Sequence, residues 1–430
     1  MLMRLLLRVV SLGAKFALTV VIARTLGFAA VGDYGLAVAA SVVASKVLGL
    51  GFSAELNRRL AGVQPVAAIG DARALRRVYG IAYLLIAALG FAAWRGGWFG
   101  ALPVASPAVL GEVVLVALAE HYALEVNSYV FSLHRTRDAS LMLFVRTGVW
   151  AALAIGGLYC GAIGDLQPVL WLWIAANGAV IGWAWRVIER VARGDATAAS
   201  VPVDAAAFGA RMRGVLAAGA AFYAATILMS GLQYLERFIA APYLSSDALG
   251  RYVFTWASAN AVQTIAYASL VVTAGPRLAK AAVNAPAQFA ATLRHALRSA
   301  LLLTAGLALA LAALSGPLFR LAHQPVDALG LAVLAILLVS FMLRSLADLL
   351  WMAAIALQQG KPVALGMAVL TGIGVLVGGR LVAHHGMLGV ALAHLASSVL
   401  VTGWLAWVVF GNAPVGRRCD GGRSGGERRA

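Results

Sequence analysis

Long runs of apolar residues, separated by short polar segments, recur along the whole chain. A helix that crosses a bilayer needs about 20 mostly apolar residues, and these runs are long enough. They do not alternate as the strands of a membrane barrel do. The pattern therefore predicts an all-α integral membrane fold with twelve transmembrane helices, at residues 6–26, 31–54, 77–98, 108–132, 140–162, 166–188, 214–242, 249–275, 298–320, 329–357, 363–383 and 387–410.

Composition supports a membrane protein and excludes the soluble classes. Of the 430 residues, 62% are hydrophobic and 12% are charged, whereas soluble domains have about 45–50% apolar and about 25% charged residues. No water-soluble fold could bury so much apolar surface. The two cysteines, Cys160 and Cys419, fall on opposite predicted sides of the membrane, so we expect no disulfide.

The distribution of basic residues predicts the orientation. A net charge of +17 would suggest a nucleic-acid partner in a soluble protein. If both termini are cytoplasmic, however, most of the 34 Lys and Arg residues fall in cytoplasmic segments, as the positive-inside rule requires. We therefore expect no nucleic-acid partner. The external loops hold only Arg24, Arg95, Arg251, Arg320 and Arg380.

An internal repeat predicts two lobes. Residues 30–61 and 248–279 align without gaps, with Gly32 and Tyr34 matching Gly250 and Tyr252. Each half holds six predicted spans, so equivalent helices point the same way, which is a parallel repeat. We expect two parallel six-helix lobes around a central cavity, with the limits 1–189 for the N-terminal lobe, 190–213 for a cytoplasmic linker, 214–411 for the C-terminal lobe and 412–430 for a basic, disordered cytoplasmic tail.

Charged residues inside the spans are the candidate functional residues. An ionisable group in hydrocarbon costs at least about 2.5–3.5 kcal/mol unless a partner or water relieves it. We therefore predict a hydrated cavity that opens to the cytoplasm and has a cationic character. Its cations would be Lys15, Lys46, Arg146 and Arg344, and the carboxylates nearby are Glu120, Glu125 and Asp348.

Purely structural roles stand beside this interpretation as open alternatives, because oppositely charged residues at these spacings can neutralise each other. The pairings are Arg344 with Asp348 on one helix, Lys15 or Lys46 with Glu120 or Glu125 between helices, and Glu236 with Arg237 as a cap at the membrane interface.

Motifs of catalysis and metal binding are missing from the sequence. Gly360-Lys361-Pro362 lacks the glycine-rich lead and the Ser or Thr of a P-loop. His384 and His385 are adjacent and cannot share one face of a helix. We expect neither an enzyme nor a resident metal or cofactor.

Several short motifs along the chain together suggest a family. They are Val21-Ile22-Ala23-Arg24-Thr25-Leu26-Gly27, Gly32-Asp33-Tyr34-Gly35, Leu48-Gly49-Leu50-Gly51, Asn57-Arg58-Arg59, Glu236-Arg237-Phe238-Ile239, Leu249-Gly250-Arg251-Tyr252, Gln358-Gln359-Gly360-Lys361 and Gly386-Met387-Leu388-Gly389-Val390-Ala391. These motifs resemble the bacterial lipid-linked oligosaccharide flippases of the Wzx type, which transport O-antigen and exopolysaccharide units and belong to the multidrug/oligosaccharidyl-lipid/polysaccharide exporter (MOP) superfamily. The chain departs from the family at Glu236-Arg237, where an Asp-Arg pair is common. It also lacks two further C-terminal helices, which argues against the lipid II branch.

The resemblance implies a V-shaped pair of lobes in the bacterial inner membrane, working by alternating access. A polyprenyl-diphosphate-linked oligosaccharide would move from the inner to the outer leaflet for lipopolysaccharide or other surface polysaccharide biosynthesis. Its partners would be membrane lipids, the polysaccharide polymerase and glycosyltransferases. The diphosphate would meet Lys15, Lys46, Arg146 and Arg344, and a proton or sodium gradient would couple at Glu120, Glu125 or Asp348.

Three alternatives remain open. A multidrug exporter of the same superfamily would favour an acidic cavity for its cationic substrates. A metabolite porter of the major facilitator type is only faintly suggested by residues 70–77. A transferase or scaffold of polysaccharide assembly would not move lipid-linked glycan between leaflets.

Overall fold

The computed structural model describes residues 2–49, 52–62, 65–97, 107–194 and 205–411. The described part of the first half is helical, with a short π-helical segment, Val145–Val149, between α6 and α7. Its helices are α1 (Leu2–Thr25), α2 (Phe28–Leu48), α3 (Phe52–Leu60), α4 (Pro65–Arg95), α5 (Pro107–Ser132), α6 (Thr136–Phe144), α7 (Trp150–Tyr159) and α8 (Gln167–Gly194).

The second half repeats this architecture, and a second π-helical segment, Tyr267–Val271, joins α10 to α11. The helices are α9 (Ala205–Ala240), α10 (Ser246–Ala266), α11 (Val272–Asn284), α12 (Pro286–Ala313), α13 (Ser315–Leu321), α14 (Ala328–Ala356) and α15 (Gly360–Gly411).

Helices occupy all twelve predicted spans, and the all-α membrane fold is confirmed. By length and composition, seven helices of the described chain can cross a membrane, or eight if the bent α9 is one span. One of these, α15, contains two predicted spans that meet at Gly386, where φ is +54°. The other predicted spans coincide with α1, α5 and α10–α11, which carry charged or polar side chains.

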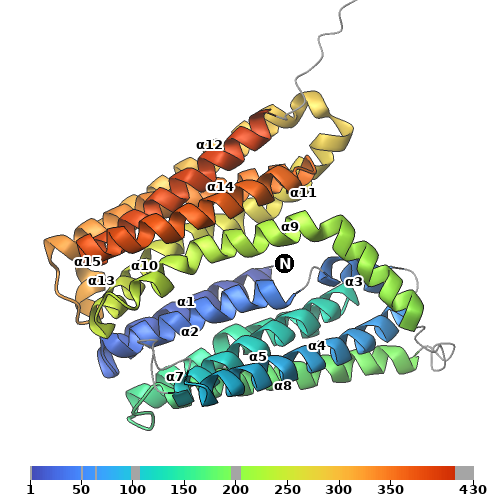
Figure 1. Cartoon of the computed structure of the whole chain (residues 1–430), viewed down its shortest axis with the longest axis horizontal. Coiled ribbons are helices and arrows are strands. Elements are labelled where there is room, and N and C mark those ends of the chain that lie inside the picture. The colour runs from blue at the N-terminus through green and yellow to red at the C-terminus, as the bar shows by residue number, and fades with distance from the viewer. Residues whose placement is uncertain (1, 50–51, 63–64, 98–106, 195–204, 412–430) are drawn as a thin grey trace, which may run out of the picture.

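The helices form two groups that lie side by side (Figure 1). In the N-terminal group, α5 packs against α2 and α8, and in the C-terminal group α14 packs against α12 and α15. Each group has its own apolar core, built around residues such as Tyr79 and Tyr129 in one and Phe289 and Met367 in the other. A third core continues from α1 and α2 into α10 and therefore joins the groups.

The two groups meet where α2 and α10 begin, and we call this contact, between Phe28–Gly35 and Ser246–Val253, the seam. A Cβ on Gly32 would lie 3.0 Å from the carbonyl oxygen of Ser246, and a Cβ on Gly250 would overlap the backbone carbonyl of Phe28. These two contacts are equivalent under the repeat. The seam therefore lies on the pseudo-twofold axis that relates the two halves, and it needs glycine for the close approach.

Arg237 of α9 reinforces the seam. Its side chain is 1% exposed, and its Nη1 donates a hydrogen bond of 2.8 Å to the carbonyl oxygen of Gly35. The guanidinium carbon lies 3.9 Å from the ring centroid of Trp256, a cation–π contact. Glu236 is also buried, at 5% exposure. Both side chains are therefore buried within the protein, and their role as an interfacial cap stays a prediction.

At the opposite end, α9 bends by 63° between Ala217 and Gly219, and we call the part before the bend, Ala205–Ala217, the elbow. The elbow packs against the N-terminal core through Phe208 and Met212. Arg211 of the elbow forms a 2.7 Å ion pair with Asp71 of α4, which also pairs with Arg59. Much of the range predicted as a linker is thus helical and bound to the N-terminal group.

The remaining domain limits stay predictions. The second group of helices begins with the part of α9 after the bend, which starts at Gly219. This is close to the predicted limit of 214. The tail at 412–430 lies outside the described residues.

We predict that Gly250→Ala destabilises the protein, because its new Cβ would meet the Phe28 backbone, which cannot move aside as a side chain can. Overpacking of this kind costs about 1–3 kcal/mol. The melting temperature of the purified protein in detergent measures the loss. In Gly306→Ala the new Cβ meets nothing within 4 Å, so this control should melt at or above the wild-type temperature. Equal melting of both variants and wild type would contradict the seam.

Candidate functional site

A buried charge cluster lies inside the N-terminal lobe, between α1, α5, the first π-helical segment and α8. Arg146 Nη1 donates to Glu120 Oε1 at 2.5 Å, and Trp173 Nε1 donates to Glu120 Oε2 at 3.0 Å. The ammonium of Lys15 is close enough to interact electrostatically with both Glu120 and Arg146. With two cations and one carboxylate, this cluster carries one net positive charge.

Two stacked tryptophans support Lys15. The rings of Trp150 and Trp173 lie parallel, 4.9 Å apart with an interplanar angle of 5°. Lys15 Nζ lies 5.2 Å from the Trp173 ring centroid and 5.8 Å from that of Trp150. The faces of aromatic rings attract cations, most strongly where water is excluded. The stacked pair therefore holds the ammonium of the half-buried Lys15 against the lobe.

Arg146 retains a donor for a ligand. Its Nε is buried and has no hydrogen-bond partner in the described part of the chain. Arg146 belongs to the π-helical segment Val145–Val149, and such insertions into α-helices are frequent at functional sites. The guanidinium is thus held by Glu120 on one side while one of its N–H groups is unsatisfied.

A second cluster of the same lobe joins Lys46 of α2 to α5. Lys46 is half-buried and interacts electrostatically with Glu125, whose Oε2 accepts a 3.2 Å hydrogen bond from the Tyr129 hydroxyl. His121 Nε2 lies 3.8 Å from Glu125 Oε1, and the other ring nitrogen is hydrogen-bonded to the Tyr83 hydroxyl. His121 and Glu125, one turn apart on α5, therefore share one face of the helix.

Arg344 and Asp348 lie in the other lobe. Arg344 is 2% exposed, and it donates to Ser398 Oγ at 3.0 Å, Ser397 Oγ at 2.9 Å and the Leu232 carbonyl at 3.2 Å. Asp348 accepts a 2.8 Å hydrogen bond from Gln263. Arg344 thus connects α14 to α9 and α15 through neutral acceptors, while Asp348 connects α14 to α10.

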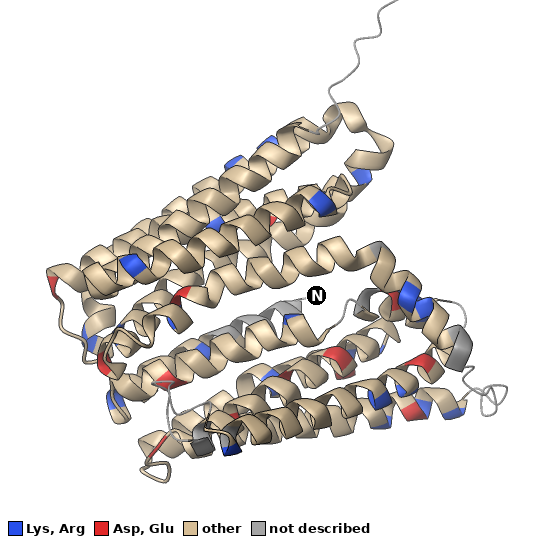
Figure 2. Cartoon of the chain, viewed as in Figure 1, with Lys and Arg blue, Asp and Glu red and all other residues tan. Residues whose placement is uncertain are grey.

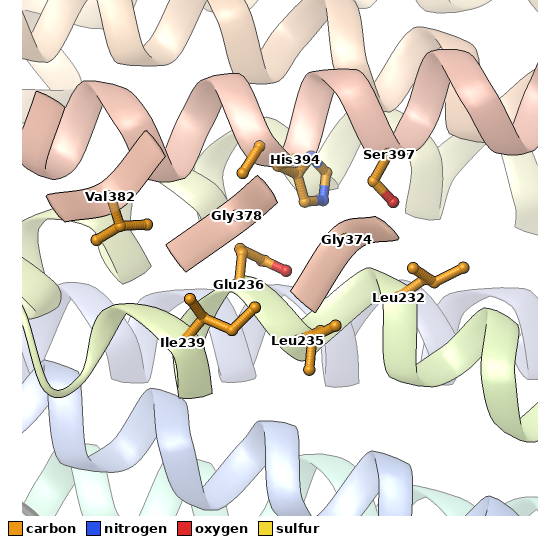
Figure 3. Close-up of a pocket in the computed structure, with 10 residues that line it drawn as sticks. Leu232, Leu235, Glu236, Ile239, Gly374, Gly378, Val382, His394 and Ser397 are labelled. Atoms are coloured by element: carbon orange, nitrogen blue, oxygen red, sulfur yellow. The ribbon is translucent and has the colours of Figure 1, made fainter. Parts of the chain in front are cut away.

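A small cavity of the C-terminal lobe contains a carboxylate and an imidazole that sequence reasoning missed as a site. Figure 3 shows Glu236 of α9 directed toward α15, where His394 and Ser397 line the same space. The cavity measures about 20 Å³, roughly enough for one water. Glu236 Oε2 and His394 Nε2 have no hydrogen-bond partner among the described residues. A water or cation between them would satisfy one or both.

The sequence offered little signal for this cavity. Glu236 was visible only as one half of an adjacent charged pair, and His394 is a single histidine in an apolar helix. Figure 2 shows that most charged positions lie toward the ends of the helices, with few along their middle. The sequence could have indicated this cavity only through a titratable residue inside one span and a second titratable residue at a matching depth in another.

The structure therefore divides the predicted site residues into three sets. Lys15, Glu120 and Arg146 come together in one cluster, and Lys46 and Glu125 in a second cluster of the same lobe. The lysine–glutamate proximity of the structural alternative is thus present, whereas ligand binding by these residues stays a prediction. The third set, Arg344 and Asp348, belongs to the C-terminal lobe.

Comparisons with known proteins identify the fold. No family model matches the chain, and no curated protein matches its sequence. Among solved structures, the chain is similar to the lipid II flippase MurJ in an inward closed conformation, with a TM-score of 0.71 and 11% identity over 95% of this chain and 88% of that chain. It is also similar to an inward-facing multidrug resistance MATE family transporter, with a TM-score of 0.70 and 12% identity over 93% and 94% of the two chains.

The chain has the fold of the MOP-superfamily transporters. A third similar structure, from Pyrococcus furiosus, is a MOP-superfamily transporter described as having a binding pocket of reverse polarity (TM-score 0.61, 15% identity, 94% of this chain and 93% of that chain). Together with the apolar helices, this fold makes the chain a multi-pass membrane protein. These similar structures are transporters, whereas their sequence identity is too low to transfer a substrate.

We predict that Glu120→Gln destabilises the N-terminal lobe strongly, because it leaves the charges of Lys15 and Arg146 buried together without their carboxylate. Breaking a buried pair in this way costs about 3–5 kcal/mol. Thermal unfolding in detergent measures the effect. The control is Glu55→Gln, which removes the partner of the exposed Arg58 in an i,i+3 pair and should cost about 0–1 kcal/mol. Similar losses in the two variants would contradict the burial of the cluster.

Proposed function

We propose that this protein is a flippase that moves a polyprenyl-diphosphate-linked oligosaccharide from the inner to the outer leaflet of a bacterial inner membrane by alternating access. The observation that carries the proposal is the net-positive cluster of Lys15, Arg146 and Glu120 within a membrane-spanning lobe. A diphosphate is a dianion or more, and guanidinium and ammonium groups bind it through charge-assisted hydrogen bonds.

The proposed binding step uses the unsatisfied donor of Arg146. Phosphate oxygens would accept from its Nε and from the ammonium of Lys15, while Glu120 holds the guanidinium in place. Lys46 supplies a further cation from α2, the helix that forms the seam. The polyprenyl tail stays in lipid, so only the charged and sugar-bearing part of the substrate needs a polar path. Arg344 of the C-terminal lobe is also predicted to contact the diphosphate.

The proposal includes coupling to an ion gradient, with Glu120, Glu125 and Asp348 as the candidate residues. Glu120 pairs with Arg146, and Glu125 interacts with Lys46. Asp348 accepts a hydrogen bond from Gln263. A proton or sodium ion that neutralised Glu120 would release Arg146 toward the diphosphate. Polysaccharide polymerases and glycosyltransferases are the proposed partners that would consume and supply the glycan.

A multidrug or metabolite exporter is the second candidate. The similarity to a MATE transporter, with a TM-score of 0.70, supports an exporter as much as the similarity to MurJ supports a flippase. The unpaired carboxylate oxygen of Glu236 offers a cationic substrate one negative site. The net-positive cluster of the N-terminal lobe favours the anionic substrate.

Reconstitution into vesicles tests the proposal. The probe is a fluorescent polyprenyl-diphosphate disaccharide, and a membrane-impermeant quencher reports the fraction that reaches the outer leaflet. We expect wild-type protein to equilibrate the probe between leaflets. Lys15→Gln should slow this at least about tenfold, because it removes one charge-assisted contact to the diphosphate.

The control variant is Lys280→Gln, which replaces an exposed lysine of α11 and should flip the probe at the wild-type rate. Melting temperature and elution volume confirm that both variants are folded. Flipping by Lys15→Gln at the control's rate would remove Lys15 from the substrate path. If wild-type vesicles leave the probe in place but export a cationic dye, the exporter candidate is correct.

A further inference from the structure

A second cavity opens at the seam end of the C-terminal lobe, apart from the buried clusters. It measures about 340 Å³, within the range of small-molecule sites, which hold about 300–1,000 Å³. Four segments converge on it: the start of α10, the turn after α13, the start of α14 and the residue after the Gly386 kink of α15. Its polar lining consists of Asp247, Arg251, Gln324 and Asp327.

Gln324 forms the buried wall of the cavity. It is 4% exposed, and its Oε1 has no hydrogen-bond partner within the described residues. The backbone fixes this position: His323 has a φ of +56°, and Gln324 N donates a 2.8 Å hydrogen bond to the Phe319 carbonyl. An amide oxygen that is buried without a partner destabilises the fold. A ligand that reached it with a donor would relieve this.

The exposed rim supplies further donors and acceptors. Asp247 and Arg251 form a 2.9 Å ion pair one turn apart on α10. Asp327 caps α14, with its Oδ1 accepting from Gly330 N at 2.6 Å, and its carboxylate is exposed. Leu329 and Met387 complete the lining with apolar surface. The cavity therefore combines carboxylates, an amide and a guanidinium with a small apolar face.

This combination selects among ligand classes. Two carboxylates against one guanidinium, which is already paired, disfavour an anion. No group of three His, Cys, Asp or Glu side chains in the described chain is placed to hold a metal ion, and the lining has no aromatic ring to hold an organic cation. A neutral polyhydroxyl ring fits: its hydroxyls can donate to Asp and Gln oxygens and accept from Arg, while its C–H face packs on Leu329 and Met387.

The cavity borders the contact between the lobes. Arg251, on its rim, lies 5.8 Å from the ring centroid of Phe28, and the next residue along α10 toward the N-terminus is Gly250, which packs on the Phe28 backbone. If alternating access parts the lobes at this end, as the proposed function requires, the cavity borders the space that opens, because Arg251 and Gly250 both lie against Phe28. In the predicted orientation this is the external end of the protein.

We infer that this cavity binds one neutral sugar residue of the transported glycan as it leaves the space between the lobes. The inference rests on the proposed function for its physiological ligand, but binding itself needs no transport. Asp247, Gln324 and Asp327 accept hydroxyl hydrogen bonds, Arg251 donates one, and Met387 packs on the ring. The site is chemically distinct from the cationic cluster that would bind the diphosphate.

Saturation-transfer NMR on the full-length protein in nanodiscs tests the site. The probes are the methyl glycosides of glucose, galactose, mannose and N-acetylglucosamine, each measured separately. We expect at least one to receive saturation from the wild-type protein. Gln324→Met should weaken that binding at least about tenfold, because it removes the amide and keeps the side-chain length. Asp327→Asn, which can still cap α14, should weaken it as well.

The matched control is Gln288→Met, at an exposed glutamine near the start of α12, and it should bind the probe like wild type. The inference is overturned if none of the four glycosides binds, if Gln324→Met and Asp327→Asn both bind like the control, or if calcium or magnesium displaces the sugar competitively. The vesicle assay keeps the two proposals separate. If the sugar binds but the probe is not flipped, the sugar site is supported and the flippase function is rejected. If the probe is flipped but no sugar binds, the flippase function is supported and the sugar site is rejected.

Discussion

The close approach of α2 and α10 is the contact that the rest of the structure depends on. Gly32 and Gly250 are equivalent under the repeat, and each lies against the backbone of the other helix because neither has a Cβ. Gly35 meets the Val253 side chain at a third equivalent pair of positions. Arg237 then spans the lobes by donating to the Gly35 carbonyl. Two similar six-helix groups are thereby placed about one axis, with their interiors on either side of it.

Within that frame, the two lobes satisfy their buried charges differently. The N-terminal lobe holds Lys15 and Arg146 against the single carboxylate of Glu120, so it keeps a positive charge and an unsatisfied donor. The C-terminal lobe surrounds Arg344 with neutral acceptors and keeps Glu236 and His394 beside a space for about one water. Under the proposed function, an anionic substrate would meet its cations in one lobe, and a small cation would meet its ligands in the other.

Much of the fold could be predicted from the sequence because the membrane imposes strong rules. Apolar runs predicted twelve spans that are all helical in the structure, and the Gly-x-Tyr match at Gly32 and Gly250 predicted the internal repeat. The bend of α9 was not predicted, and the elbow before it is held to the first lobe by tertiary contacts, such as the pair of Arg211 with Asp71, which are far apart in the sequence. Hydropathy alone also could not show that Ala205–Ala217 is helical and packs on the first lobe.

The site was predictable in part for a related reason. Charges inside spans are rare and stand out, so Lys15, Glu120 and Arg146 were visible in the sequence, and their clustering followed from the cost of burying them apart. Which partner each residue takes depends on helix rotation. The sequence therefore left open whether Arg344 pairs with Asp348, whereas the structure gives Arg344 to Ser397, Ser398 and the Leu232 carbonyl. His394 had no sequence signal at all.

The proposed function requires the two lobes to open alternately at their two ends, and paired distance measurements test this most directly. Spin labels at Asp165→Cys and His323→Cys report the seam end, and labels at Arg137→Cys and Lys361→Cys report the opposite end. Both native cysteines, Cys160 and Cys419, are replaced first. We expect a lipid-linked glycan to lengthen the first distance while it shortens the second. Two distances that stay fixed, or that change in the same direction, would contradict the account.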